Sequence, residues 1–249
     1  MSKKVEGKKS SSKKQEKTKE DKKIIKSEKN ILKTKQNIQV LWLLSLMIAI
    51  ILIIFIVPYV KTNIVNKFEY MNLDFYKTKL GEIPFYSTKI PLVDIAGNAI
   101  GTYNINLRED PRDLEYINVE IPNDIIDFTR NKENYISLPS DLPICENNII
   151  AVTSLIDFLE NFGNMEFSIG MVNETYALET GFPYVTCETH PTTTIILINQ
   201  GEETSIKREG TNCYELTFNE CEINEVSEKF IYEIVDNYMD TYVKRFGKP

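Results

Sequence analysis

The sequence predicts a mixed α/β domain of the α+β type, joined to one transmembrane helix and preceded by a lysine-rich tail. Three observations lead to this prediction. An apolar run without any charged residue occupies positions 40–60, and the segment before it is rich in lysine. The segment after it alternates between strand-type and helix-type hydrophobic periodicity and contains all four cysteines of the chain.

The run from Val40 to Val60 is long enough to cross a bilayer. At about 1.5 Å per residue such a helix spans roughly 30 Å, which matches one hydrocarbon core. It has no polar stripe of the kind that a soluble core helix shows. Trp42 and Tyr59 stand near its two ends, where aromatic side chains anchor at the membrane interface. We therefore expect a transmembrane segment over residues 37–60, with membrane lipid as its partner.

The charge distribution predicts the orientation of this helix. Residues 1–36 contain 14 lysines and 5 acidic residues, a net charge of +9, whereas the whole chain has a net charge of −7. Lysine-rich flanks remain in the cytoplasm. A cleaved signal peptide is the rival interpretation, but the leader is 39 residues long and no small-x-small cleavage site follows the run. We expect an uncleaved signal anchor with the N-terminus in the cytoplasm and the C-terminal domain outside the cell membrane.

The N-terminal tail, residues 1–36, is low in complexity and almost free of large apolar residues, so we expect it to be disordered. Its lysines suit anionic lipid head groups or nucleic acid. No aromatic residues are interleaved among them, which disfavours stacking on single-stranded nucleic acid. The simpler interpretation, a positive tail that only sets the topology, is favoured, and nucleic acid is not expected as a partner.

Residues 61–85 begin with apolar positions at helical spacing, which predicts a continuation of the membrane helix or a short stalk that ends at Gly81 and Pro84. The external domain is expected over residues 86–249. Its first half is predicted to contain a β-hairpin over 86–108, a helical turn after Asp110-Pro111, a strand at 119–121, a helix at 123–130 and a strand at 135–138.

The second half of the domain is predicted to contain two main amphipathic helices, residues 146–162 and 223–246. Gly163 stands where the C-terminal cap of the first helix is expected. Alternation of strand and helix implies right-handed crossovers and a partly parallel sheet. The remaining expected elements are strands at 165–172 and 184–188, a short helix at 175–180, and an antiparallel meander of strands at 192–198, 204–207 and 213–218.

Four cysteines beyond the apolar run suggest two disulfides in an oxidising compartment. A Cys213–Cys221 bridge is disfavoured, because a strand between them separates the Cα atoms by more than ~17 Å, against the roughly 5.5 Å that a bridge needs. Cys145 and Cys221 each precede a major helix, and two helices packed side by side bring these ends together. The sequence therefore favours the pairs Cys145–Cys221 and Cys187–Cys213.

The sequon Asn173-Glu174-Thr175 also lies on the predicted outer side, so Asn173 is a candidate glycosylation site.

Catalytic motifs are sparse in this sequence. Cys187 and His190 are the candidate thiolate and base, but residues three apart in a strand point to opposite faces. The chain has no phosphate-binding glycine loop, no GxSxG and no CxxC pair. A carboxylate pair remains open, because 31 acidic residues lie outside the tail. We expect no catalytic residues, no metal and no cofactor.

Several short motifs of the outer segment resemble a known group of proteins. These are Leu107 to Arg112 (LREDPR), Tyr135 to Leu138 (YISL), Tyr184 to Glu188 (YVTCE), Asn212-Cys213-Tyr214, and Cys221 with its following helix. They resemble an uncharacterised family of small archaeal single-pass membrane proteins with an external, cysteine-bearing domain. The resemblance spans roughly residues 86–240 and implies an archaeal envelope setting. It implies no activity and no catalytic residues.

Two hypotheses on function follow. The favoured one is a membrane-anchored external binding or structural domain that engages another envelope protein or a larger membrane complex. The alternative is an extracytoplasmic enzyme, a hydrolase or thiol oxidoreductase, that uses Cys187 and His190 or a carboxylate pair. The oligomeric state is left open.

Overall fold

The computed structural model describes residues 40–61, 66–94, 96–122, 126, 128, 133–145 and 147–248. The chain divides into two units, residues 1–63 and 64–249, which we treat separately. The described part of the first unit is a helix over Val40–Val60 that is long and apolar enough to cross a membrane, and none of its apolar window is buried. Trp42 and Tyr59 are exposed on this helix, as interfacial anchors require.

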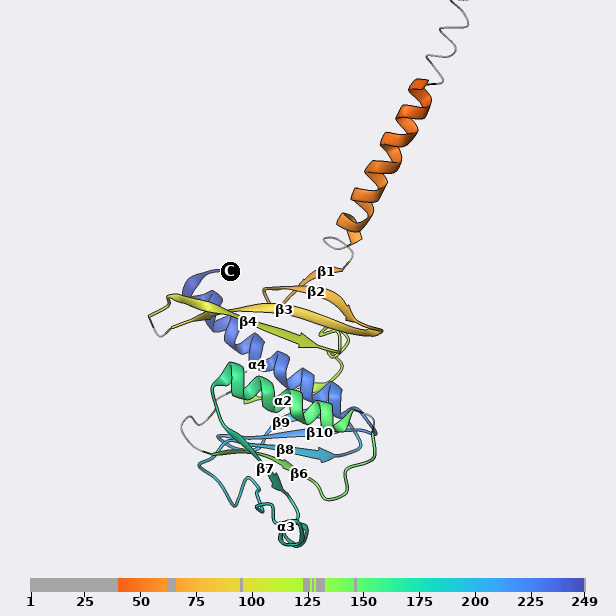
Figure 1. The fold of residues 1–249 in the computed structure, drawn as a ribbon. Helices are drawn as coiled ribbons and strands as arrows, with labels where there is room; N and C mark the ends of the chain where they lie inside the picture. Colours follow the sequence, from red (N-terminus) through yellow and green to blue (C-terminus); the bar gives the residue numbers. More distant parts are fainter. Residues whose placement is uncertain are drawn as a thin grey trace, which may run out of the picture. The chain divides into compact units, whose positions relative to one another are not determined.

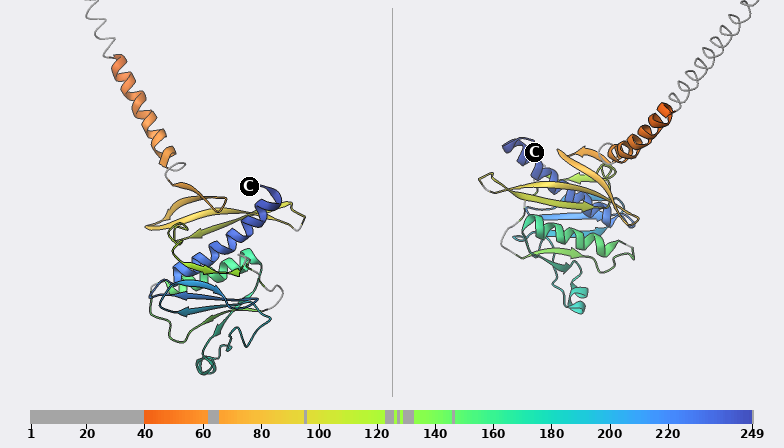
Figure 2. Two further views of the ribbon diagram at one scale, coloured as in Figure 1. Left: turned by 180° about the vertical axis from the view of Figure 1, so that it is seen from behind. Right: turned by 45° about the horizontal axis from the view of Figure 1, so that its top comes forward.

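The second unit has three layers, with two helices between two β-sheets (Figure 1). Figure 2 shows the same layers from behind and from above. The upper sheet, sheet A, consists of β1 (Lys67–Tyr70), β2 (Leu73–Leu80), β3 (Ile83–Val93) and β4 (Ala99–Leu107). The lower sheet, sheet B, consists of β5 (Asn118–Glu120), β6 (Asn134–Leu138), β7 (Phe167–Met171), β8 (Ile195–Gln200), β9 (Ser205–Arg208) and β10 (Cys213–Phe218). The helices are α2 (Asn148–Gly163) and α4 (Ile223–Phe246) between the sheets, and α3 (Glu174–Thr180) after β7.

The predicted mixed α/β class is confirmed, but the domain has two sheets instead of one. Sheet A is antiparallel, with the strand order β1-β2-β3-β4. Sheet B has the order β5-β9-β10-β8-β6-β7, and β6, β7, β8 and β10 run parallel to one another. The two predicted main helices form α2 and α4 and lie in the layer that both sheets cover.

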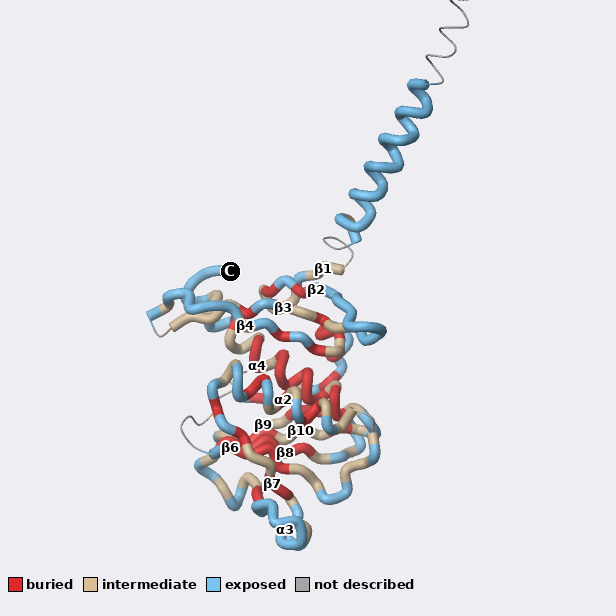
Figure 3. Tube along the Cα trace, in the orientation of Figure 1, coloured by how far each residue is buried: buried red, intermediate tan, exposed pale blue. Residues whose placement is uncertain are grey.

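Helix α4 is the centre of the domain. Seven consecutive residues, 226–232, are buried, so neighbours surround the helix on every side here (Figure 3). The ring of Phe230 packs on Tyr214 of β10, with centroids 5.3 Å apart. The ring of Tyr232 packs on Phe75 of β2, with centroids 5.9 Å apart. One helix thus supplies core residues to both sheets.

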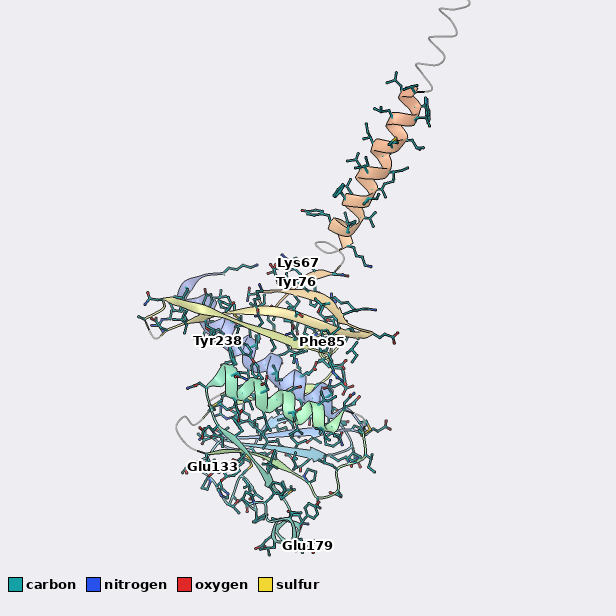
Figure 4. All side chains as sticks on the ribbon, viewed as in Figure 1. Lys67, Tyr76, Phe85, Glu133, Glu179 and Tyr238 are labelled. Carbon is teal, nitrogen blue, oxygen red and sulfur yellow. A yellow bond between two sulfur atoms is a disulfide. The ribbon has the colours of Figure 1, made fainter. Side chains whose placement is uncertain are left out.

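The C-terminal half of α4 continues under sheet A. Tyr238 lies there (Figure 4), and its hydroxyl donates a hydrogen bond of 2.8 Å to the carbonyl oxygen of Pro91 in β3. The ring of Phe162, on α2, contacts the same tyrosine edge-on at 5.3 Å. These contacts join α2, α4 and sheet A near the β3–β4 turn.

The predicted stalk over residues 61–85 is wrong where the structure describes it. Residues 67–70 and 73–80 form β1 and β2, and β3 begins at Ile83. Met71 and Asn72, with φ of 51° and 57°, make the two-residue left-handed turn that joins β1 to β2. Methionine rarely adopts this conformation, so the turn has no sequence signature. Gly81 lies at the β2–β3 turn, whereas Pro84 lies inside β3.

The predicted antiparallel meander is also wrong in its order. Strand β10 lies between β8 and β9, pairing parallel with β8 and antiparallel with β9. The reason is burial. Four residues of β10 are buried, namely Cys213, Tyr214, Leu216 and Phe218, whereas β9 ends in the partly exposed Lys207 and Arg208. The more apolar strand therefore takes the central place.

Three smaller predictions fail locally. Residues 111–116 form hydrogen-bonded turns and not a helix. The expected strand at 184–188 is reduced to one bridge, between Tyr184 and Met171, because the chain turns at Thr186–Thr189. Helix α2 includes Gly163, and Asn164 takes the left-handed cap position with φ of 52°. Of the helix expected at 123–130, only Ile126 and Phe128 fall within the described residues, so this prediction lies outside them.

A substitution in α4 tests the central position of this helix. Replacing the fully buried Phe230 by alanine should lower the free energy of unfolding by about 3–5 kcal/mol, because the large cavity faces a packed core. The matched change Leu178→Ala, at a side chain that is 80% exposed, should alter it by less than about 0.5 kcal/mol. Urea unfolding of the full chain in detergent, followed by circular dichroism, measures both values. Equal effects would contradict the central role of α4.

Candidate functional site

The four cysteines form the two pairs that the sequence favours. The Cα atoms of Cys145 and Cys221 are 5.6 Å apart, and those of Cys187 and Cys213 are 5.7 Å apart, and both pairs are bonded. The first pair joins the segments that lead into α2 and α4. The second joins the start of β10 to the loop before β8. Both pairs therefore fix connections around sheet B.

The candidate thiolate and base do not form a catalytic pair in this structure. Cys187 is bonded to Cys213, so it offers no thiolate. The Nδ1 atom of His190 lies 2.8 Å from the hydroxyl of Thr189, and its ring packs on Tyr135 at 5.5 Å. These contacts hold the turn before β8 against β6. They give His190 a structural role that needs no catalytic function.

Asn173 is exposed and caps α3. Its Oδ1 atom accepts a hydrogen bond of 3.0 Å from the backbone N–H of Tyr176. A glycan is attached through the amide nitrogen of the sequon asparagine, so the cap and the modification use different atoms. Glycosylation at this position stays a prediction.

A buried carboxylate fastens the end of β4 to α4. Glu228 is 3% exposed, and the backbone N–H groups of Arg108 and Glu109 donate to its oxygens at 2.9 Å and 2.7 Å. Burial raises the pKa of Glu228 to about 7, although these donors favour the ionised form. The oxygens already accept hydrogen bonds and are closed off from solvent. This arrangement positions the chain and leaves no room for a substrate.

Other polar groups near the start of α4 surround this carboxylate. Asn224 donates to a carboxylate oxygen of Glu109 at 3.3 Å, and burial raises the pKa of Glu225. Within the described residues, no group of three or more histidine, cysteine or acidic side chains has the arrangement of a metal site. This region is therefore part of the structural framework of the domain.

The edges of the two sheets differ sharply in how they are protected. Edge strands normally carry charges, are short, or are covered, since free backbone groups invite pairing with other chains. Strand β1 has four residues with Lys67 and Glu69 among them, and β5 has three residues and ends in Glu120. Strand β7 is partly covered, because Met171 exchanges backbone hydrogen bonds with Pro183 and Val185. Only β4 among the described edges lacks each of these protections.

Strand β4 is nine residues long, with the sequence AIGTYNINL, and contains no charge and no proline. Its side chains alternate at the end near α4. Ile105 and Leu107 are buried toward the helices, and Asn104 and Asn106 are exposed on the outer face of sheet A.

The direction of the free backbone groups of β4 follows from the hydrogen bonds of the neighbouring strands. The N–H of Lys77 in β2 donates to Asn66, on the β1 side, so Thr78 bonds toward β3. Thr78 is paired with Phe85, and the alternation continues across β3 to β4. As a result, residues 103, 105 and 107 of β4 bond to β3, and the backbone groups of Thr102, Asn104 and Asn106 point outward. No hydrogen bond within the described part of the chain reaches these outward groups.

A groove of about 420 Å³ runs beside this edge. One side is formed by five consecutive residues of β4, Tyr103 to Leu107, and the other by α2. The α2 residues are Thr153, Ser154, Asp157 and Phe158. Tyr103 and Asp157 face this groove from its two sides, and burial and the negative charge of Asp157 raise the pKa of Tyr103. The candidate site is thus a free strand edge with a partly acidic groove.

The sequence predicts the hairpin over residues 86–108 and therefore the strand, but not the site. Its pattern does not indicate which strand stands at a sheet edge. The available signal was the absence of charge over residues 99–107, in a chain in which 26% of residues are charged.

Comparisons with models of protein families, with curated proteins and with solved structures found no match for this chain. The resemblance to an archaeal membrane family therefore stays a prediction.

The raised pKa of the buried Glu228 predicts that the stability of the protein depends on pH. Its pKa in the folded protein, about 7, exceeds the unfolded value of 4.5, so the folded state binds more protons between these values. The raised pKa of Glu225 acts in the same direction. The free energy of unfolding should therefore decrease by about 2–3 kcal/mol as the pH rises from about 5 to about 8. Thermal unfolding across this range measures the effect.

The matched variants for this measurement are Glu228→Gln and Glu160→Gln. The first should remove most of the pH dependence and lower stability at pH 5 by about 1–3 kcal/mol, because the amide nitrogen of glutamine faces a backbone N–H. Glu160 is exposed on α2, and its replacement should leave the profile unchanged. A Glu228→Gln profile that parallels that of the unsubstituted protein would show that another group titrates.

Proposed function

We propose that this protein is a single-pass, membrane-anchored domain on the outer side of the cell membrane that binds another envelope or membrane protein. The observation that supports binding most directly is the long, uncharged edge strand β4 beside the groove at α2, whose outward backbone groups have no partner among the described residues. A soluble domain exposed to other proteins would gain by protecting such an edge. Use of the edge as a binding surface would explain why β4 lacks such protection, since sheet edges recognise extended segments through main-chain hydrogen bonds.

The anchoring and the orientation rest on separate features. The helix Val40–Val60 offers apolar side chains on every side, which suits lipid. The two bonded cysteine pairs suit an oxidising compartment. The net charge of +9 on residues 1–36 favours a cytoplasmic tail.

Labelling of lysines in intact cells tests the orientation with an internal control. A membrane-impermeant amine reagent should modify the exposed Lys79 and Lys89, and none of the 14 lysines of residues 1–36. Mass spectrometry of the purified protein reads both regions in one sample. After the cells are opened, the tail lysines should be labelled too. Modification of the tail in intact cells would reverse the proposed orientation.

Site-specific photo-crosslinking tests the binding function. A photoreactive residue at the outward position Asn104 of β4 should give a discrete adduct with another protein in living cells that produce the chain and its natural neighbours. The same residue at Glu120, on the short edge strand β5, is the control and should give none. The absence of any adduct from β4, or equal adducts from both edges, would overturn the proposed binding surface.

A further inference from the structure

We propose that the groove between β4 and α2 binds an extended, cationic segment of a partner protein, which adds to β4 as a further strand of sheet A. This inference rests on the proposed binding function and names the chemistry of the partner. It follows from three features: the spacing of the outward backbone groups of β4, the composition of the groove, and the net negative charge of residues 64–249.

The backbone of β4 is a template for one more strand. The outward N–H and C=O groups of Thr102, Asn104 and Asn106 recur at every second residue, which is the repeat that an added strand needs. Strand addition gains affinity from these main-chain hydrogen bonds, and side chains on the two faces of the added strand supply the specificity.

The groove side of the added strand suits a side chain with an apolar stem and a positive end. Tyr103 is the partly exposed aromatic side chain of the groove, and its ring packs edge-on against the buried Phe158 at 6.1 Å. Thr153, Ser154 and the exposed Asp157 form its polar wall. The stem of a lysine or arginine would pack on the ring of Tyr103 while its charged group reaches the carboxylate of Asp157.

The outer side of the added strand suits small polar side chains. It would lie beside Thr102, Asn104 and Asn106, which are all exposed. The hydroxyl of Ser87 donates to the side chain of Asn106 at 2.7 Å, so this face already carries a polar network. The segment that fits the edge therefore alternates cationic and small polar residues.

A second copy of this chain fits the edge less well. Residues 64–249 have a net charge of −17, since residues 1–63 contain 15 lysines and 5 acidic residues in a chain of net charge −7. Antiparallel pairing of two β4 strands would place both α2 helices on the same face of the joined sheet. The exposed Asp157 and Glu160 of both copies would then lie on that same face. Like charges in this arrangement disfavour the dimer and favour a positive partner.

The test uses the full chain in nanodiscs of phosphatidylcholine, which carries no net charge, and two end-capped peptides as probes. One peptide is Thr-Lys-Thr-Lys-Thr-Lys-Thr, and the other has glutamate in place of lysine. Fluorescence anisotropy of labelled peptides gives the Kd. The lysine peptide should bind at least tenfold more tightly than the glutamate peptide, and high salt should reduce the difference.

Two pairs of variants separate the proposed site from general attraction to an acidic domain. Asp157→Lys should weaken binding of the lysine peptide at least threefold, whereas Glu160→Lys makes the same charge change outside the groove and should alter it less than half as much. Asn104→Pro removes one outward N–H and should weaken binding at least fivefold, while Asn104→Ala keeps this group and should bind as the unsubstituted protein does. Thr102→Pro provides a second test of the edge, and circular dichroism confirms that each variant is folded.

Equal effects of Asp157→Lys and Glu160→Lys, or no effect of either proline, would overturn the inference. Failure of this inference can be distinguished from failure of the proposed binding function. If photo-crosslinks form at β4 in cells but the lysine peptide is not preferred, β4 binds a partner of different chemistry. If no crosslinks form, the binding function itself fails. A concentration-dependent dimer of the full chain that Asn104→Pro abolishes would assign the edge to a second copy.

Discussion

The burial of α4 between two sheets is the constraint on which the rest of the domain depends. A helix with one apolar stripe can serve one sheet, but this helix has apolar residues on two opposite sides, with Phe230 against sheet B and Tyr232 against sheet A. Without it, the residues of sheet A that it covers, such as Phe75, would be exposed to water. A two-sheet domain of this size therefore folds around its last helix, and the order of the other elements follows from which face of α4 each one covers.

This central position buries polar side chains of α4, and two of the charged ones find partners nearby. The buried stretch of α4 includes Ser227, Glu228 and Lys229, which a core helix normally excludes. Lys229 pairs with Glu233 one turn later at 2.7 Å, and Glu228 accepts the N–H groups that follow β4. A carboxylate removed from water is stable only when donors surround it. Here the donors are the backbone groups where β4 ends, so the same interaction that satisfies the charge also fixes the end of the edge strand.

The contacts of β4 explain how a strand whose outer edge has no partner among the described residues can remain ordered. Strand β4 is held on one side by β3 and at its end by Glu228, and the ring of Tyr103 packs on Phe158 and Phe162 of α2. Its outward backbone groups are therefore held in position without being used. Binding to such an edge loses little chain entropy on the side of the domain, because the template is already formed. Anchoring of the domain to a membrane would further restrict the partners that meet this edge to those at the same surface.

The sequence by itself determined the features that depend on local chemistry. The apolar run Val40–Val60, the hairpin of β3 and β4 and the helices α2 and α4 could be predicted, because hydrophobic periodicity and helix ends are properties of neighbouring residues. The favoured cysteine pairs needed one further assumption, that the two main helices pack side by side. Only the tertiary structure decided the rest. The left-handed turn at Met71 and Asn72 has no signal in its residue types, and the place of β10 between β8 and β9 depends on competition for the centre of a sheet. The free edge of β4 is a property of the same kind. A strand is at an edge only because no other strand lies beside it, and no segment of sequence records its neighbours across space.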